Sequence, residues 1–202
     1  MKFAIPRGRL MECSINLLNK AGINTNINDE RKLVFYSDKD IIMFPKPMDI
    51  PAYVEHNADI GICGSDVLLE NKNYVFSPLK LNFGKCRLSI ISNKKYKIRD
   101  LYDLKIATRH PEITYNYFRK LGINVNIIKL NGSLELAPLT GIADAIVDII
   151  ETGETLRKNN LIEIKKIMDI SAVLIVNRIS MKTKYNEINN FIDNIKGVLY
   201  EY

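Results

Sequence analysis

Short apolar runs alternate along the chain with stretches in which apolar residues recur at helical spacing. The apolar runs have the length and the β-branched content of buried strands. Helical spacing is clearest where Leu10, Leu17 and Ala21 fall on one face. This alternation predicts an α/β fold. Strands are expected at residues 3–5, 33–36, 40–44, 59–63, 88–92, 105–107, 125–130, 145–150, 161–164 and 171–176. Helices are expected around residues 10–21, 67–70, 113–121, 134–137 and 188–195.

Polar turns, most of them containing glycine, follow several predicted strands and lead directly into predicted helices. A helix N-terminus presents free backbone N–H groups and the positive end of its dipole, so it favours anions. In open α/β sheets, ligands bind at the carboxyl ends of the strands. The recurrence of such turns therefore favours a site for a polyphosphate. The turns are residues 7–9, 64–66, 108–111, 131–133 and 151–155.

The stretch 144–156 has the strongest chemical pattern of this kind. Its apolar run contains Asp148 near the end, and a polar turn with Thr152, Gly153 and Thr155 follows. Glycine lets the backbone approach an anion closely, the threonine hydroxyls add neutral donors, and a carboxylate accepts hydrogen bonds from sugar hydroxyls. The pattern suits a ribose 5-phosphate. The alternative is an ordinary turn followed by a threonine-capped helix.

Four further positions have two interpretations each. Arg9, beside Arg7, is either a bidentate phosphate ligand or a solvated side chain. Lys46 is either a surface residue or a phosphate ligand. Asp66 either caps the helix that follows it or holds a ligand amine or hydroxyl. Glu135 is either a helix-start carboxylate or a ligand acceptor, and the helix at this point is expected to be capped near Gly132 or Ser133.

Composition narrows the class of protein. The formal net charge of +6 and the sequence pI near 9.1 favour anionic partners. The basic residues are spread along the chain, so nucleic-acid binding is not expected. No apolar run is long enough to span a membrane, and no signal peptide is expected, because the first residues go straight into a strand-like segment without an apolar h-region. Cys13, Cys63 and Cys86 lack metal-ligand spacing and are expected to be free thiols in the cytoplasm.

Six collinear segments add a family resemblance that spans essentially the whole chain. The sequence resembles the short form of the ATP phosphoribosyltransferase family. The segments include Pro-Arg-Gly-Arg-Leu at 6–10, Asp-Ile-Pro at 49–51, Ala-Asp-Ile-Gly-Ile-Cys-Gly at 58–64, Phe-Gly-Lys-Cys-Arg-Leu at 83–88, Leu-Asn-Gly-Ser-Leu-Glu-Leu-Ala-Pro at 130–138, and Ala-Asp-Ala-Ile-Val-Asp-Ile-Ile-Glu-Thr-Gly-Glu-Thr-Leu at 143–156.

The resemblance implies an enzyme of histidine biosynthesis. ATP and 5-phosphoribosyl 1-pyrophosphate (PRPP) would give N1-(5-phosphoribosyl)-ATP and pyrophosphate, with Mg²⁺ as cofactor. Catalysis would consist mainly of positioning the substrates and neutralising the leaving group. The alternative from another class is a non-catalytic cytosolic module of the same fold that binds PRPP or another solute.

The resemblance also implies roles for individual residues. Arg9, Lys46 and Glu135 are the expected catalytic residues, and Arg9, Asp66 and Glu135 are expected to bind the nucleotide. No side chain is assigned to a metal. The residues expected to bind PRPP are Asp148, Glu151, Thr152, Gly153, Glu154 and Thr155.

The implied architecture is an α/β fold of two lobes resembling type II periplasmic solute-binding proteins, with the active site in the cleft between them. Lobe I would comprise residues 1–88 and 172–202, and lobe II residues 89–171. The short form implies a separate regulatory subunit that resembles histidyl-tRNA synthetase and binds histidine. We expect a homodimer within a larger hetero-oligomer.

Overall fold

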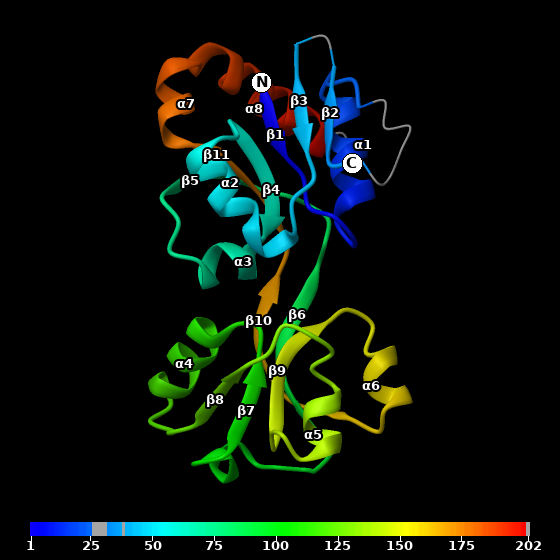
Figure 1. The fold of residues 1–202 in the computed structure, drawn as a ribbon, viewed down its shortest axis with the longest axis vertical. Coiled ribbons are helices and arrows are strands. Elements are labelled where there is room, and N and C mark those ends of the chain that lie inside the picture. The colour runs from blue at the N-terminus through cyan, green and yellow to red at the C-terminus, as the bar shows by residue number, and fades with distance from the viewer. Residues whose placement is uncertain (26–31, 38, 201–202) are drawn as a thin grey trace. The chain divides into compact units, whose positions relative to one another are not determined.

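A computed structural model of the chain describes residues 1–25, 32–37 and 39–200. The chain forms two compact units (Figure 1). One comprises Met1–Gly84 together with Ser171–Tyr202, and the other comprises Lys85–Ile170. Within the described ranges, no helix is long and apolar enough to cross a bilayer.

The first unit has a mixed sheet in the strand order β2-β3-β1-β4-β11-β5. Its strands are β1 (Lys2–Ala4), β2 (Val34–Tyr36), β3 (Ile41–Met43), β4 (Ile60–Gly64), β5 (Val75–Lys80) and β11 (Ala172–Asn177). Its helices are α1 (Met11–Lys20), α2 (Ile50–His56), α3 (Ser65–Glu70), α7 (Arg178–Thr183), α8 (Tyr185–Tyr200) and the short 3₁₀ helix η1 (Pro47–Asp49). Strand β1 pairs in parallel with both β3 and β4, whereas β11 runs antiparallel to β4 and β5.

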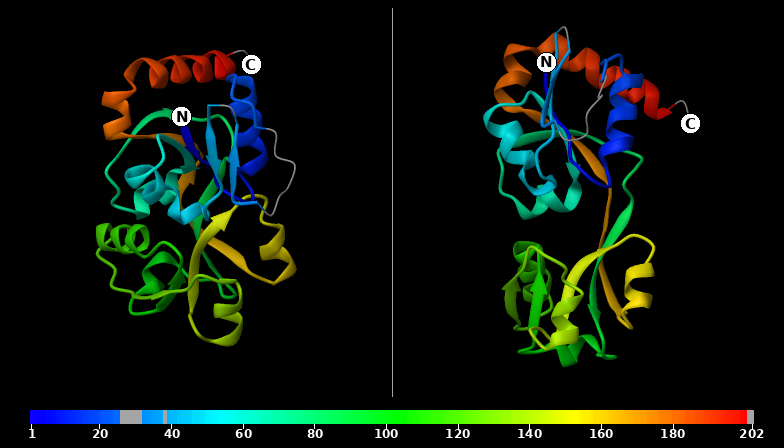
Figure 2. Two further views of the ribbon diagram at one scale, coloured as in Figure 1. Left: turned by 45° about the horizontal axis from the view of Figure 1, so that its top comes forward. Right: turned by 45° about the vertical axis from the view of Figure 1, so that its right-hand side comes forward.

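Helices cover both faces of this sheet. Successive residues of a strand point to opposite faces, so neighbouring residues contact different helices. Phe3 packs against α8, where its ring lies 5.3 Å from the ring of Phe191. The next residue, Ala4, packs with Val54 of α2 on the other face. Figure 2 shows α1 and α8 on one side of the sheet and α2 on the other. Burial on both faces explains why β4 and β11 are continuous apolar runs.

The second unit has a sheet in the order β10-β6-β9-β7-β8. Its strands are β6 (Cys86–Ser92), β7 (Lys105–Thr108), β8 (Asn126–Lys129), β9 (Ala145–Ile150) and β10 (Ile162–Ile170). Its helices are α4 (Pro111–Lys120), α5 (Leu136–Thr140), α6 (Glu154–Lys158) and the 3₁₀ helix η2 (Ile98–Leu101). The strands β7, β8 and β9 are parallel to one another, and β6 is antiparallel to β9 and β10.

Alternation along β9 decides what each of its residues contacts. Val147 packs with Phe118 of α4 on one face. Ile146 and Ile150 pack on the other face with Leu156 of α6 and with α5. Figure 1 shows α4 on one side of this sheet and α5 and α6 on the other. Asp148 lies between Ile146 and Ile150 in the alternation, so it belongs to the face that α5 and α6 cover.

Candidate active site

The parallel strands of the second unit bring three loops to one edge of the sheet. Residue pairs between β7 and β8 and between β7 and β9 run in the same direction, so the carboxyl ends of all three strands meet at that edge. The loops that follow them contain Arg109, Gly132 and Gly153 respectively. This is the position at which open α/β sheets bind ligands.

Asp148 is a carboxylate held at this edge in a largely buried position. The residue is 9% exposed, and its Oδ1 accepts a hydrogen bond of 2.8 Å from the backbone N–H of Ile149. Burial raises the pKa of Asp148, and Arg109 offsets only part of that effect. The carboxyl of Glu135 raises it further. The fold therefore brings the predicted residues Asp148 and Glu135 within electrostatic reach of each other.

The bend after β9 has the backbone conformation that a tight turn at an anion requires. Gly153 has φ of +77°, a left-handed conformation that disfavours side chains with a Cβ. It is the N-cap residue of α6, whose first N–H groups have no partner within the helix. Thr152, Glu154 and Thr155 are exposed around it. The bend thus offers backbone donors and hydroxyls to solvent.

The threonine-capped helix that we considered as the alternative is not formed. The N-cap residue is Gly153, and it carries no side-chain cap. The hydroxyl of Thr152 does accept the backbone N–H of Glu154, at 3.4 Å, but it does so from the position before the cap. Thr155 lies within the first turn. The hydroxyl hydrogens of both threonines therefore stay available as donors.

Arg109 is a candidate site residue that sequence reasoning did not single out. Its Nη2 donates to the carbonyl oxygen of Gly132 at 2.9 Å, which joins the loop after β7 to the loop after β8. Its Nε is buried and has no hydrogen-bond partner among the described residues. The available signal was its position in the polar turn 108–111, where a guanidinium follows a predicted strand.

Thr108 fixes the start of this loop against β9. Its Oγ1 donates to the carbonyl oxygen of Val147 at 2.8 Å and accepts the backbone N–H of His110 at 2.9 Å. His110 is 2% exposed and is the N-cap residue of α4. These contacts hold Arg109, which lies between them, beside the end of β9.

In the first unit, the parallel strands β3, β1 and β4 likewise end at one edge. Arg9 follows β1 and donates from Nη1 to the carbonyl oxygen of Gly84 at 3.2 Å. Lys46 follows β3 and is exposed. Asp66 follows β4 and is 3% exposed. The topology therefore gathers these three predicted residues at one edge of the sheet.

Two of the helix-capping interpretations require correction. Helix α3 begins at Ser65 with Gly64 as its N-cap residue, so Asp66 lies in the first turn and is not the cap. A Cβ at position 64 would collide with the Asp66 carboxylate, which shows that this side chain folds back over the turn. Glu135 is the N-cap residue of α5, at a position that we expected Gly132 or Ser133 to hold, and its side chain makes no cap hydrogen bond.

The predicted site residues thus fall into two groups. Arg9, Lys46 and Asp66 lie in the first unit, and Glu135, Asp148 and the bend 151–155 lie in the second. Within the described ranges, no group of three or more His, Cys, Asp or Glu residues is placed to hold a metal ion.

Known proteins resemble this chain over nearly its whole length. The HisG family model, described as ATP phosphoribosyltransferase, matches residues 46–197. A Petrotoga mobilis protein named ATP phosphoribosyltransferase is 53% identical over 196 residues, covering 96% of this chain and 93% of that protein. A Pyrococcus furiosus protein of the same name is 52% identical over 202 residues, covering 99% of each.

A solved structure also resembles this chain. A chain of the "ATP phosphoribosyl transferase (HisG:HisZ) complex from Thermotoga maritima" is 34% identical, with a TM-score of 0.88 and full coverage of both chains. This likeness confirms the expected fold, two α/β lobes of the type II periplasmic-binding-protein kind. The family model and these full-length relatives show that the chain belongs to the ATP phosphoribosyltransferase (HisG) family.

Proposed function

We propose that this chain catalyses the first step of histidine biosynthesis, the transfer of a phosphoribosyl group from PRPP to ATP. Adenine N1 attacks the anomeric carbon of PRPP, the bond from that carbon to the pyrophosphate oxygen breaks, and pyrophosphate leaves with the electron pair. The product is N1-(5-phosphoribosyl)-ATP, so the enzyme is a pentosyltransferase. Family membership and the full-length relatives support this activity.

The observation that carries the proposal is the acidic end of β9 followed by the left-handed Gly153 bend. The backbone N–H groups of Gly153, Glu154 and Thr155 bind the ribose 5-phosphate, together with the hydroxyls of Thr152 and Thr155. Asp148 accepts hydrogen bonds from the ribose hydroxyls, assisted by Glu151. Hydrogen bonds from these hydroxyls to the ionised carboxylate favour its charged form, which burial alone disfavours.

The basic residues balance the charge that develops on pyrophosphate. Arg9 and Lys46 contact the pyrophosphate or the triphosphate of ATP, and Arg109 adds a guanidinium beside the end of β9. Asp66 and Glu135 contact the nucleotide. Such fixed charges lower the barrier because they stabilise the leaving group more than the intact substrate.

Mg²⁺ enters this reaction with the substrates. ATP and PRPP carry phosphate oxygens, which Mg²⁺ prefers as ligands while it keeps several waters. The described residues offer no cluster of three ligands, so we assign the ion to the substrate pyrophosphate and not to a protein centre.

Assembly and location follow from the same proposal. We propose a regulatory subunit related to histidyl-tRNA synthetase as the partner, because the similar Thermotoga maritima chain is part of a HisG:HisZ complex. The catalytic chain would form a homodimer within that hetero-oligomer, and its two units would be the two lobes expected at residues 1–88 with 172–202 and at 89–171. The three free cysteines suit the reducing cytoplasm, where we place the enzyme.

Replacing the hydroxyl of Thr155 tests the proposed activity and the proposed phosphate site in one assay. The protein is mixed with ATP, PRPP and Mg²⁺, with the regulatory subunit present, and the N1-substituted adenine is followed by ultraviolet absorbance. Thr155→Val should raise the KM for PRPP about tenfold to a hundredfold, because a hydrogen bond to a charged group contributes about 1.5–3 kcal/mol. Thr140→Val is the control, since this exposed threonine lies in α5 and bonds only its own helix, at Leu136.

Comparison of the unaltered chain with Thr155→Val separates a failure of the proposed activity from a failure of the proposed site. No product with the unaltered chain and its partner would refute the activity. Product formation with the same PRPP KM in Thr155→Val as in the unaltered chain would remove Thr155 from the site while leaving the activity standing.

A further inference from the structure

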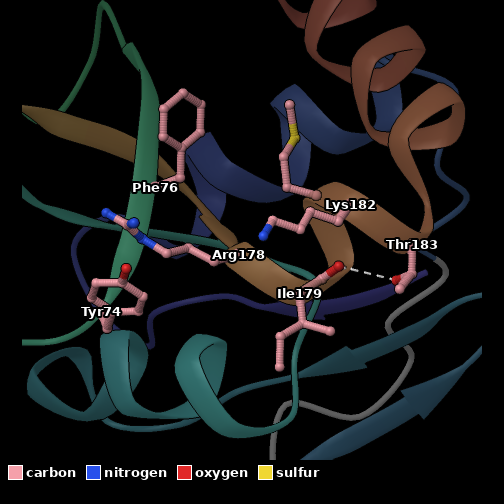
Figure 3. A pocket seen from close by; sticks show the side chains of 7 residues that line it. Tyr74, Phe76, Arg178, Ile179, Lys182 and Thr183 are labelled. Carbon is pink, nitrogen blue, oxygen red and sulfur yellow. Dashed lines mark hydrogen bonds between the residues drawn. The ribbon is translucent and has the colours of Figure 1, made fainter.

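A pocket of about 600 Å³ lies in the first unit between β5 and α7, and no residue proposed for the substrates lines it (Figure 3). Its volume is within the range of small-molecule sites, about 300–1,000 Å³. Tyr74 and Phe76 line it from the start of β5, and Arg178, Ile179 and Lys182 line it from α7. It therefore combines aromatic and aliphatic surface with two cations.

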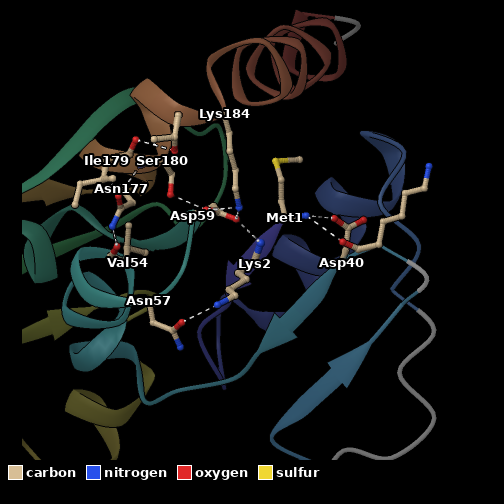
Figure 4. Close-up of polar contacts among 12 residues, drawn as sticks. Met1, Lys2, Asp40, Val54, Asn57, Asp59, Asn177, Ile179, Ser180 and Lys184 are labelled. Atoms are coloured by element: carbon tan, nitrogen blue, oxygen red, sulfur yellow. Dashed lines mark hydrogen bonds and ion pairs between the residues drawn. The ribbon is translucent and has the colours of Figure 1, made fainter.

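The α7 wall of this pocket is firmly anchored. Asn177 caps α7 by accepting the backbone N–H groups of Ile179 and Ser180, each at 2.8 Å, and its Nδ2 donates to the carbonyl oxygen of Val54 at 2.7 Å. The carboxylate of Asp59 accepts Ser180 Oγ at 2.6 Å (Figure 4). These hydrogen bonds hold the first turn of α7 in place, so the backbone that carries the pocket side chains has a defined position.

The last turn of α7 is anchored to the same carboxylate. Lys184 Nζ lies 2.8 Å from Asp59 Oδ2. Burial alone would raise the pKa of Asp59, but the hydrogen bonds from Lys184, from Ser180 and from the backbone N–H of Lys2 outweigh it and lower the pKa. Asp59 therefore stays charged at neutral pH and holds α7 from both ends.

The two cations of the pocket have no carboxylate partner in the part of the chain that the structure describes. The Arg178 guanidinium stacks on the ring of Tyr74 at 3.7 Å, which leaves its N–H edge for a planar anion. Figure 3 shows Lys182 extending toward Arg178 and Phe76. The neighbouring Glu55 carboxylate is engaged by Asn73 Nδ2 at 2.7 Å.

Apolar surface completes the site. Phe76 is 45% exposed and Ile179 is 70% exposed, although both are large apolar side chains. Exposed apolar surface collected in a hollow marks a place of binding more often than isolated residues do. A flat ring laid against these side chains would remove their surface from water.

The sheet register separates this pocket from the substrate residues. Asn177 at the end of β11 pairs with Val75, and Val176 pairs with Ile60 at the start of β4. The pocket therefore lies at the edge where β4 begins. Arg9, Lys46 and Asp66 lie at the opposite edge, where the parallel strands end. The pocket is a second site and not an extension of the first.

We propose that the pocket between β5 and α7 binds a small anion that carries a flat apolar ring. The anionic group lies between the Arg178 guanidinium and the Lys182 ammonium, and the ring packs on Phe76 and Ile179. Arg178 keeps its stacking on Tyr74 while its edge donates to the anion. A second copy of this chain fits less well, because a two-fold axis at this site would bring the cations of one copy against those of the other.

Two fluorescent probes that differ in one charged group test the proposal on the full chain. The anionic probe is 8-anilino-1-naphthalenesulfonate, and its neutral analogue without the sulfonate is N-phenyl-1-naphthylamine. The anionic probe should bind at one site, and Lys182→Glu should weaken its binding about tenfold to a hundredfold, the scale of a lost charged hydrogen bond. Lys182→Arg should retain binding, and the neutral probe should respond little to either change.

Further variants control for a general effect of charge and for loss of folding. Lys120→Glu makes the same charge change on an exposed side chain of α4 and should leave the anionic probe bound as before. If Lys182→Glu does not fold, as judged by its thermal melt, Arg178→Gln replaces it. Unchanged binding of the anionic probe in these pocket variants, or equal weakening of both probes, would overturn the proposal.

Displacement then identifies the anionic group. Phenyl phosphate and benzoate each carry a flat ring, one with a phosphate and the other with a carboxylate. Displacement of the bound sulfonate probe by one of them assigns the class of the ligand. Failure of both to displace it would also overturn the proposal.

Discussion

Replacement of Gly153 by alanine tests the phosphate-binding bend selectively. The φ of +77° at Gly153 lies in the left-handed region, and a Cβ there would meet only Ile150 Cγ2, at 3.8 Å. Alanine therefore fits in space but costs about 1–2 kcal/mol in backbone conformation. Gly141 is a matched control, because its φ is +76°, a Cβ there meets nothing within 4 Å, and it terminates α5 in the same unit.

The same backbone strain should have different consequences at the two positions. In Gly141→Ala it lowers stability, with a fall in melting temperature of about 2–8 °C. In Gly153→Ala the unliganded bend relaxes, and binding of the ribose 5-phosphate must restore the left-handed conformation. That restoration corresponds to a KM for PRPP about five- to thirtyfold higher.

Initial rates with PRPP varied at saturating ATP, together with thermal melts of each variant, provide the assay. We expect Gly153→Ala to raise the KM for PRPP and Gly141→Ala to leave it unchanged while melting earlier than the unaltered chain. An equal rise in both variants would show that the effect is general destabilisation. No rise in Gly153→Ala would show that the bend does not hold the phosphate.

Three further predictions concern carboxylates and packing. Burial raises the pKa of Asp148, so the KM for PRPP should rise as the pH falls through that pKa; a profile that Asp148→Asn leaves unchanged would contradict this role. Asp59 has a lowered pKa because hydrogen bonds, first from Lys184, outweigh its burial. Its stabilising effect is fully present above the pKa of the unfolded chain and is lost as the pH falls through the lower folded pKa. Asp59→Asn should therefore lower the free energy of unfolding in urea at neutral pH by about 1.5–3 kcal/mol, and equal stability would refute the anchoring of α7. A Cβ at Gly61 would lie 2.5 Å from Val54 Cγ2, so Gly61→Ala should cost about 1–3 kcal/mol by calorimetry; an unchanged melt would show that α2 shifts freely.

The strands that the sequence predicted best are those buried on both faces. Residues 59–63 and 145–150 are apolar almost throughout, and they form β4 and β9 in the middle of their sheets. Their pattern is strong because each side chain packs against a helix on one face or the other. Because these apolar runs end abruptly, the polar residues that follow them could be recognised from the sequence as candidate binding turns.

The strands that the sequence missed lie at sheet edges. No strand was expected over Val75–Lys80, which forms β5 with an internal proline and several exposed side chains. The strand expected at 161–164 continues to Ile170, through the exposed residues Lys165, Lys166 and Asp169. Edge strands carry charge and proline because these discourage pairing with other chains. Helix α7 is only six residues long and offers no periodicity.

In the candidate site, the features that depend on neighbouring residues in the sequence were predictable, and those that depend on the tertiary fold were not. The turn at 151–155 was predictable because its residues are adjacent in sequence and glycine and threonine have local roles. The proximity of Asp148 to Glu135 and Arg109 depends on the strand order β9-β7-β8, which no local pattern specifies. The caps of α3 and α5 were misjudged because a neighbouring residue, Gly64 or Glu135, takes the cap position.

A crystal structure of the full chain with PRPP bound tests the central claim most directly. The account predicts the 5-phosphate within hydrogen-bond distance of the backbone N–H groups of Gly153, Glu154 and Thr155, with ribose hydroxyls on the carboxylate of Asp148. Density for the phosphoribosyl group elsewhere on the chain, with solvent at this bend, would contradict it.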